Sequence, residues 1–485
     1  MSPLELAQPA QFGARQAFIE AAYLLASVLF ILGLRGLTRP DRARRGMQLA
    51  AAGMLVAIVG TLVHHEIVAY GWILAGLALG AVIGWPLGTR VPMTAMPQRI
   101  AISHMFGAVA ATVVGVAEYT HLAALGAVGR GQMAALGFEV LFGALTVTGS
   151  LMAFGKLQEL LPARPLTFPG QNVLSIGLFL AGIGLLVWLV AAPLHPAAFL
   201  AMVAVGLLFG VSLVLPIGGA DMPVVLSLLN SYAGLASAAT GFAIGNSVLI
   251  IAGALDGASG FILSMVMSRA MNRSFGNVLF GAFGAAPPPQ AGAAGPRPVH
   301  PITVEDAALE LAWARLVIVV PGYGLAVAQA QHQVRDLAQL IERNGGTVLY
   351  AIHPVAGRMP GHMNVLLAEA DIPYDRLKEL DEINGEFRNA DVALVIGAND
   401  VVNPAARTDH ASPLYGMPIL DADQARHVIV LKRSMAPGFA GVDNPLFHAP
   451  NTSLLFGDAR ASLSALVHEV RQAEAGDRLP APGRV

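Results

Sequence analysis

The sequence predicts two fold classes in one chain: a polytopic α-helical membrane domain of about nine spans, then an α/β domain with a doubly wound parallel sheet. Composition is the first reason. The mean hydropathy is +0.62, and charged residues make up 12% of the chain, against about 25% in soluble proteins. Order along the chain is the second reason. Apolar segments fill the chain to about residue 275, and strand-like and helix-like segments alternate after about residue 302.

Length, charge and cysteine content limit the function further. At 485 residues the chain is long enough for two or three domains. Its net charge of −2 gives no general attraction to nucleic acid, so no nucleic-acid partner is expected. The absence of cysteine excludes disulfides, thiolate chemistry and iron–sulfur ligation. The first 15 residues lack a basic region with a cleavage site, so we expect no cleaved signal peptide.

The apolar part contains nine segments that are long enough to cross a bilayer, which requires about 20 mostly apolar residues. They are rich in Ala, Gly, Leu and Val, and small residues allow helices to pack closely in lipid. We therefore expect the lipid bilayer as the environment of this domain. The spans are predicted at about 18–38, 47–66, 71–89, 100–120, 134–154, 172–192, 197–217, 223–243 and 248–268.

Basic residues indicate the orientation, because cytoplasmic loops carry an excess of Lys and Arg. The opposite side carries only Arg130, with Arg15 before the first span. The prediction is a multi-pass protein of the bacterial cytoplasmic (inner) membrane, with the N terminus outside and everything after about residue 275 in the cytoplasm. The basic residues after spans one, three, five and nine are Arg39, Arg42, Arg44, Arg45, Arg90, Arg99, Lys156, Arg164, Arg269 and Arg273.

Polar and ionisable side chains in the spans are few and costly, so they are candidates for a proton path. Histidine is the best single candidate, because its pKa lies near physiological pH. The alternative is that these groups only form hydrogen bonds between helices, or that His104 lies at the membrane interface. We favour a purely structural role most strongly for Glu139 and Asp256. The candidates for the proton path are His104, Asp221, Ser227 and Asn230.

A segment rich in Pro, Gly and Ala separates the two predicted domains. Residues 276–301 cannot build a core and are typical of a semi-extended spacer. We therefore divide the chain into a membrane domain over 1–275, a linker over 276–301 and a soluble domain over 302–485.

The soluble domain shows alternating strands and amphipathic helices, which is the pattern of a parallel sheet covered on both faces. Helices are predicted at about 303–313, 324–344, 362–370 and 459–474. The predicted strands are 316–320, 347–352, 392–396, 428–432 and 453–456.

A glycine motif follows the first of these strands at once. Gly322, Gly324 and Val327 form a GxGxxV variant of the dinucleotide-binding pattern, in which the glycines permit a tight turn and a close approach of the backbone to a pyrophosphate. A second match at Gly182 and Gly184 lies inside a predicted span, where we interpret it as helix packing. Only the first match follows a strand and opens a helix, so it predicts a Rossmann-like nucleotide site.

The remaining motifs favour NADP over NAD. The second strand is not followed by the Asp or Glu that usually holds the ribose of NAD. Instead, Lys432, Arg433 and Ser434 follow the fourth strand, and two cations with a hydroxyl suit a 2′-phosphate. Further loop residues follow the third and fifth strands at the same expected edge of the sheet. They are Gly397, Ala398, Asn399, Asp400, Gly457 and Asp458.

Neither a Ser–His–acid set nor a metal-binding cluster stands out in the sequence. His353 and His362 flank the second loop, and we interpret them as loop residues and not as zinc ligands.

Long motifs in both halves carry a resemblance to a known family. In the soluble half they are 322–331, 353–364, 397–400, 432–435 and 444–447, and in the membrane half they are 218–225, 229–232 and 270–275. Together they resemble the beta subunit of proton-translocating NAD(P) transhydrogenase, in the same order and over nearly the whole chain.

The resemblance implies roles for residues at matching positions. Gly322, Tyr323, Gly324 and Val327 match the loop that wraps the NADP pyrophosphate. Lys432, Arg433 and Ser434 match the 2′-phosphate site, and Arg358 matches a nearby nucleotide contact. Asp400 matches the acid near the nicotinamide, while His104 and Asn230 match residues implicated in proton transfer. Phe439 replaces a common Tyr in the loop over the nucleotide, and Asp256 matches no role in the family.

The resemblance also implies an activity and partners. A Si-specific/Re-specific transhydrogenase of this kind moves hydride from NADH on an alpha subunit to NADP held here, driven by inward proton movement. Because this chain has one dinucleotide site, NAD(H) is expected on the partner, in a homodimer of alpha–beta units. From the residues alone, an NADP-regulated channel or transporter without hydride transfer is the alternative. A membrane-anchored soluble dehydrogenase is disfavoured, because one span suffices as an anchor.

Overall fold

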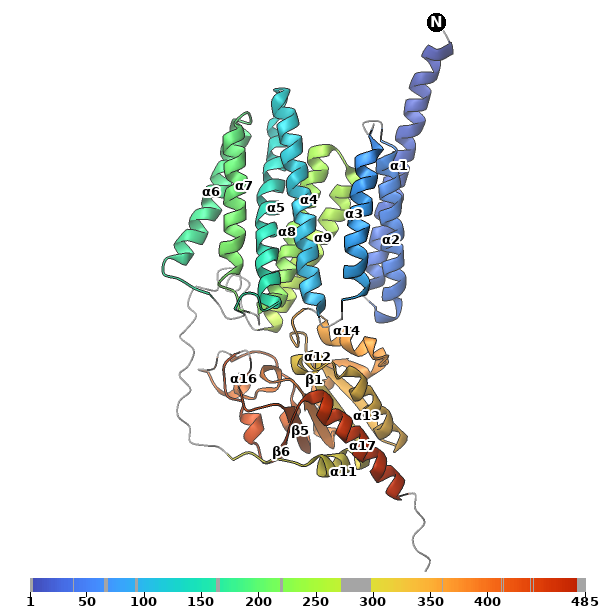
Figure 1. The fold of residues 1–485 in the computed structure, drawn as a ribbon, viewed down its shortest axis with the longest axis vertical. Helices are drawn as coiled ribbons and strands as arrows, with labels where there is room; N and C mark the ends of the chain where they lie inside the picture. The colour runs from blue at the N-terminus through green and yellow to red at the C-terminus, as the bar shows by residue number, and fades with distance from the viewer. Residues whose placement is uncertain are drawn as a thin grey trace, which may run out of the picture.

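The computed structural model agrees with the predicted division into a helical bundle and an α/β domain, which lie one above the other (Figure 1). It describes the residues 3–37, 39–64, 69–91, 95–162, 166–218, 221–271, 298–359, 361–410, 412, 414–436, 438 and 440–477. Most of the predicted linker, Phe439, and the end of the 270–275 motif lie outside the described residues.

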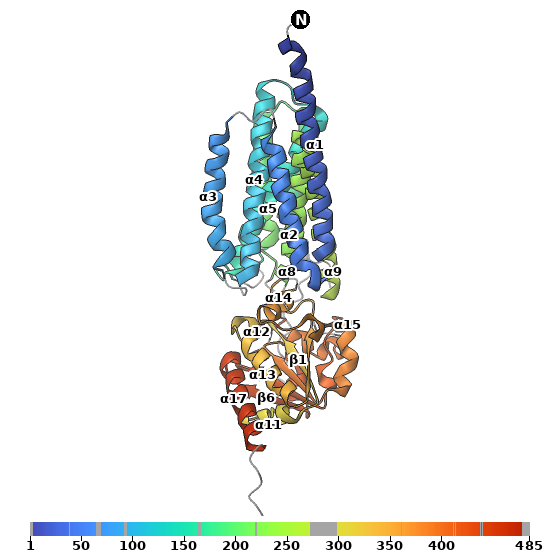
Figure 2. The same cartoon turned by 90° about the vertical axis from the view of Figure 1, so that its right-hand side faces the viewer.

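Nine helices in the described part of the chain are long and apolar enough to cross a membrane. Each predicted span corresponds to one of them. α3 stands apart at one side of the bundle (Figure 2) and none of its residues is buried. The helices are α1 (Pro3–Leu37), α2 (Pro40–Leu62), α3 (Tyr70–Thr89), α4 (Met96–Ala124), α5 (Arg130–Leu157), α6 (Gln171–Ala191), α7 (Pro196–Val214), α8 (Met222–Ile244) and α9 (Ser247–Ala270).

The helices α8 and α9 pack closely against each other, and glycine is the reason. At Gly260 a Cβ atom would lie 2.9 Å from the Asn230 Nδ2, and at Gly257 it would lie 3.0 Å from the side chain of Leu235. The hydroxyl of Ser231 donates a 2.7 Å hydrogen bond across this contact to the carbonyl of Gly257. Small residues and hydroxyls of this kind hold helices together where lipid removes the hydrophobic drive.

Lys156 lies inside the bundle and not in the loop after span five. Its side chain is 2% exposed, and its ammonium donates hydrogen bonds to the carbonyls of Leu215 at 2.5 Å and Ile217 at 2.7 Å. These carbonyls follow the C-terminal end of α7, where a cation is stabilised by the helix dipole and by unpaired carbonyl groups. Lys156, one of the basic residues from which the orientation is predicted, therefore also joins α5 to the end of α7.

The α/β domain contains a six-stranded parallel sheet in the order β3-β2-β1-β4-β5-β6. All five predicted strands are present, and β3 is a sixth that the sequence did not predict. β3 has three residues, two of them charged, and it pairs only with β2 at the edge of the sheet. The strands are β1 (Leu316–Pro321), β2 (Thr347–Ile352), β3 (Leu377–Glu379), β4 (Val392–Ile396), β5 (His427–Lys432) and β6 (Thr452–Phe456).

Helices cover both faces of the sheet. One face is covered by α11 (Val304–Trp313), α13 (Gln331–Arg343), α14 (His362–Glu369) and α17 (Ala459–Asp477). The other is covered by shorter segments around Phe387 and Phe447. The predicted helix 324–344 is divided into α12 (Tyr323–Val327) and α13, because Gln329 between them has a left-handed φ of +49° that no continuous helix contains. Before α11 begins, the backbone of His300 and Ile302 forms hydrogen bonds with the backbone of Leu454 in β6.

Candidate functional site

Two loops cross at the carboxyl edge of the sheet, where β1 and β4 lie side by side. The amide of Gly324 donates to the carbonyl of Gly397 at 3.0 Å, and the amide of Gly322 donates to that of Ile396 at 2.9 Å. A Cβ atom at Gly324 would lie 2.7 Å from the Cα of Gly397, and Gly397 itself has a φ of +66°. Glycine is therefore required at both sides of the crossing. The order 3-2-1-4-5-6 changes direction here, which is where open α/β sheets bind ligands.

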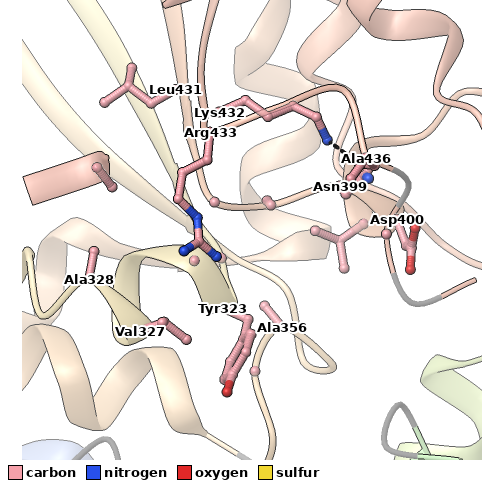
Figure 3. Close-up of a pocket in the computed structure, with 18 of the residues that line it drawn as sticks. Tyr323, Val327, Ala328, Ala356, Asn399, Asp400, Leu431, Lys432, Arg433 and Ala436 are labelled. Carbon is pink, nitrogen blue, oxygen red and sulfur yellow. Dashed lines mark hydrogen bonds between the residues drawn. The ribbon is translucent and has the colours of Figure 1, made fainter. Parts of the chain in front are cut away.

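A cavity of about 710 Å³ opens beside this crossing (Figure 3). Its volume lies within the range of about 300–1,000 Å³ found for ligand and cofactor sites. All the predicted cofactor-binding residues except Arg358 line this cavity. These residues are Gly322, Tyr323, Gly324, Val327, Gly397, Ala398, Asn399, Asp400, Lys432, Arg433, Ser434, Gly457 and Asp458.

The end of β5 brings two cations to the cavity, and both are labelled in Figure 3. Lys432 is half-buried, and its ammonium donates to the Ala436 carbonyl at 2.9 Å and lies 4.6 Å from the centre of the Phe447 ring. Burial lowers the pKa of Lys432, and the charges of Asp400 and Asp443 oppose that shift. Arg433 is exposed to the cavity. This edge therefore offers two positive charges to an anionic group, one half-buried and one exposed.

Asp400 contacts two described residues that follow β5, Gly438 and Ala440. Its Oδ2 accepts a 3.0 Å hydrogen bond from the amide of Ala440, and Gly438 passes so close that a Cβ there would clash with the carboxylate. Asn444 supports the same turn, because its Nδ2 donates to both the carbonyl and the Oδ1 of Asn399 at 3.1 and 3.0 Å. The sequence motif at 444–447 therefore acts by holding the 397–400 loop, a structural role that the motif alone did not reveal.

Arg358 is turned away from the cavity and toward the membrane domain. Its guanidinium donates to the carbonyl of Leu157 at 3.0 Å and to the carboxylate of Glu159 at 3.3 Å, just after α5. The same guanidinium lies 4.3 Å from the centre of the Tyr323 ring. The contact with a nucleotide that the resemblance implies for Arg358 stays a prediction. Arg358 joins the glycine-motif loop to the bundle.

His353 and His362 are buried parts of the loop after β2. The Nε2 of His353 is 2.8 Å from the carbonyl of Pro418, and the Nδ1 of His362 accepts from the amide of Arg358 at 3.1 Å. Burial lowers the pKa of each to about 4. Both are therefore neutral near pH 7. Among the described residues there is no group of three possible metal ligands, and both histidines shape the loop.

The candidates in the bundle are brought together only in part. His104 of α4 meets the side chain of Asn230 of α8, so these two form a pair across the helices. The hydroxyl of Ser227 donates to the carbonyl of Pro223 at 3.0 Å, within its own helix. Asp221 stands at the N-terminal end of α8, nine residues before Asn230, which is about 14 Å along the helix axis.

Asp256 is the residue of this region that sequence reasoning set aside. The Nδ2 of Asn230 donates a 3.0 Å hydrogen bond to its Oδ1, and its carboxylate is close enough to His104 for their charges to interact. Helical spacing on one chain segment does not reveal a contact between α8 and α9, so the sequence carried no direct signal for it.

The fold and the site define a class: a polytopic membrane protein with a Rossmann-like dinucleotide domain attached. A model of the NAD(P) transhydrogenase beta subunit family matches residues 19–469. The NAD(P) transhydrogenase subunit beta of Rhodospirillum rubrum is 50% identical over 454 residues, covering 92% of this chain and 98% of that protein. The same subunit from a named strain of that organism matches equally well. The chain belongs to the NAD(P) transhydrogenase beta subunit family.

Proposed function

We propose that this chain binds NADP(H) in the cavity at the sheet edge and accepts hydride from NADH held by an alpha subunit, with proton movement across the bundle driving the reaction. The observation that carries the proposal is that one chain contains both a dinucleotide-type cavity and a cluster of polar side chains inside a helical bundle, and that the bundle contacts the cavity. Met271, the residue after α9, lines the same cavity as Lys432.

The residues at the cavity fit NADP(H). The crossed glycine loops leave backbone in place of side chains where a pyrophosphate must approach. Lys432, Arg433 and Ser434 line the cavity and suit the 2′-phosphate, which NAD lacks. Asp400 lines the same cavity at the loop after β4, and we place the nicotinamide end near this loop.

The bound nucleotide supplies the hydride chemistry, and the protein positions it. Direct transfer between two nicotinamides needs close placement more than a general acid or base. This chain contributes one dinucleotide site in its described part, so the NAD(H) must come on the alpha subunit that the relatives' name implies. The hydrogen bonds of the crossed loops fix the backbone at the cavity, which would serve that placement.

Proton movement supplies the drive. One charge that crosses a potential of 100 mV releases about 2.3 kcal/mol, which corresponds to a shift of about 50-fold in an equilibrium. This free energy biases NADP⁺ against NADPH only if the site binds them differently in different protonation states of the bundle. In the described part of the chain, the bundle reaches the site through the link from Arg358 to the carbonyl of Leu157 and through Met271 and Val355, which line the cavity and pack against α8 and α9.

The proposed setting is the bacterial inner membrane. The N terminus lies outside and the NADP domain lies in the cytoplasm, as the basic residues after the odd-numbered spans indicate. The assembled enzyme is a Si-specific/Re-specific transhydrogenase, built as a dimer of alpha–beta units in the lipid bilayer. We keep the domain boundaries at 1–275, 276–301 and 302–485.

Proteoliposomes test the function. This chain and its alpha subunit are reconstituted together, and the formation of NADPH from NADH and NADP⁺ is followed with and without an inward proton gradient. The expected result is a gradient-dependent acceleration that an uncoupler abolishes. A rate of hydride transfer that is the same with and without the gradient would contradict the proposed coupling. Proton flux that needs NADP but occurs without hydride transfer would instead indicate an NADP-regulated channel.

A further inference from the structure

Asp256 occupies an unusual place for a carboxylate. It lies nine residues from the start of the 24-residue helix α9, about 14 Å along the helix, and so near the middle of the membrane. Its side chain lies on an exposed part of α9. Ionisable residues at this depth are costly and mark ion paths by default.

The packing of α8 against α9 fixes the position of Asp256. The hydrogen bond from Ser231 to the Gly257 carbonyl, 2.7 Å long, locks the neighbouring residues of the two helices together. Gly260 leaves no room for a side chain next to the amide of Asn230. With the helices held in this register, Asn230 donates to Asp256 at 3.0 Å.

Asn230 contacts His104 as well as Asp256. Three helices, α4, α8 and α9, therefore meet at one amide that has a histidine on one side and a carboxylate on the other. Among the described titratable groups, His104 and Asp256 are close enough for the charge of each to act on the other. The nearby hydroxyls of Ser227 and Ser231 donate their hydrogen bonds to backbone carbonyls.

We propose that Asp256 is a proton-binding residue of the membrane path and forms one unit with His104 through the amide of Asn230. This inference rests on the proposed proton coupling. One proton entering the unit changes its charge from one negative charge to zero, as an ion pair or as two neutral groups. A histidine alone changes from neutral to one positive charge, which is less favourable within lipid.

The charge balance predicts the effect of removing the carboxylate. In Asp256→Asn, the amide keeps the hydrogen bond from Asn230, but the unit must become positively charged to carry a proton. We expect gradient-driven NADPH formation to fall by about tenfold or more, and the remaining coupled rate to decline at a lower pH than in the wild type. Asp256→Glu keeps the charge and should restore the rate and the pH profile.

The experiment uses the full chain with its alpha subunit in proteoliposomes, and measures gradient-driven NADPH formation and dye-reported proton uptake across a pH series. Glu20→Gln is the matched control, because Glu20 is an exposed carboxylate of α1 that accepts a 3.2 Å hydrogen bond from the Gln16 amide of the same helix; it should match the wild type. Binding of NADP(H) and thermal unfolding of each variant separate misfolding from lost proton binding, because an effect on the path leaves both unchanged.

The outcomes separate the two proposals. Wild-type protein that transfers hydride without any proton movement would overturn the proposed coupling, and this inference with it. Coupled wild-type protein together with an Asp256→Asn variant of equal coupled rate and equal pH profile would overturn the role of Asp256 alone. An Asp256→Glu variant as impaired as Asp256→Asn, with normal folding, would also contradict it.

Discussion

At the scale of single residues, position along the sheet edge determines what each charged group does. Lys432 and Arg433 follow β5 and line the cavity, whereas Arg426 lies just before the same strand and is paired with Asp391 at 2.8 Å. The strand runs between them, so similar side chains at its two ends have unrelated roles. Charge at the carboxyl end is available to a ligand, and charge at the amino end is not.

Replacing Lys432 and Arg433 with Ala should therefore weaken NADP(H) binding with little effect on folding. A charge-assisted hydrogen bond contributes about 1.5–3 kcal/mol, so we expect the affinity for NADP(H) to fall by roughly 100-fold. The preference for NADP(H) over NAD(H) should fall with it. Calorimetric titration of the purified chain measures both affinities. Arg426→Ala is the control, and equal affinities in all three proteins would refute the 2′-phosphate assignment.

The buried histidines of the β2 loop predict sensitivity to acid. The pKa of His353 and of His362 is about 4 in the folded chain, and about 6.5 in an unfolded one. The unfolded state therefore binds protons first as pH falls. The contribution of the two neutral histidines to the free energy of unfolding is fully present above pH 6.5 and is lost as the pH falls from about 6.5 to 4. The loss is on the order of 2 kcal/mol per histidine at pH 5.

Thermal unfolding of the purified full chain at pH 7 and pH 5 tests this. The melting temperature should fall between the two pH values in the wild type, and fall less when both histidines are replaced by Asn. A His332→Asn variant serves as the control, because His332 has an exposed side chain. If all three proteins lose equal stability, the acid sensitivity has another origin.

At the scale of secondary-structure elements, local signals predicted most of the fold. Apolar segments of about 20 residues defined all nine membrane helices, and β1 with its glycine motif defined the nucleotide edge. The failures are contacts between distant segments. β3 is too short and too charged to show a strand pattern, and it exists because β2 supplies its partner. In the same way, the orientation of Arg358 depends on Glu159, which lies just after α5 and is 199 residues away from Arg358 in the sequence.

The crossing of two loops gives a prediction at this scale. Gly397→Ala adds a side chain where φ is +66° and where the backbone of Gly324 and Leu325 leaves no space. Strain of about 1–3 kcal/mol is expected, with a displaced glycine loop and weaker NADP(H) binding. Gly385→Ala is the matched control, because a Cβ there meets nothing within 4 Å. Thermal unfolding and NADP(H) titration of both variants measure the difference, and equal behaviour would contradict the crossing.

At the scale of the whole molecule, a small contact joins the two domains. The α/β domain lies against the end of the bundle, with α12 and α14 nearest to it (Figures 1 and 2). Val355 packs against the cluster of Val224 and Met267, and Arg358 reaches α5. An interface of this size transmits movement only if its few contacts differ between two states of the protein.

Arg358 is the contact on which this transmission should depend most. The ion pair with Glu159 contributes about 0–1 kcal/mol, because the carboxylate is 72% exposed. The bond to the Leu157 carbonyl places a cation at the C-terminal end of α5, where the helix dipole also favours it. Loss of the carboxylate should therefore matter less than loss of the guanidinium, which also contacts the Tyr323 ring of the glycine loop.

Three variants in proteoliposomes with the alpha subunit distinguish these contributions. Arg358→Gln should reduce the acceleration of NADPH formation by a proton gradient by roughly threefold to tenfold, which is about 0.7–1.4 kcal/mol of coupling free energy. Glu159→Gln should change it by less than about twofold. Arg376→Gln, which breaks a 3.4 Å ion pair with Glu342 inside the α/β domain, should leave it unchanged. If Arg358→Gln retains the full response to the gradient, coupling passes instead through Met271 and Val355, because these residues line the cavity and pack against α8 and α9.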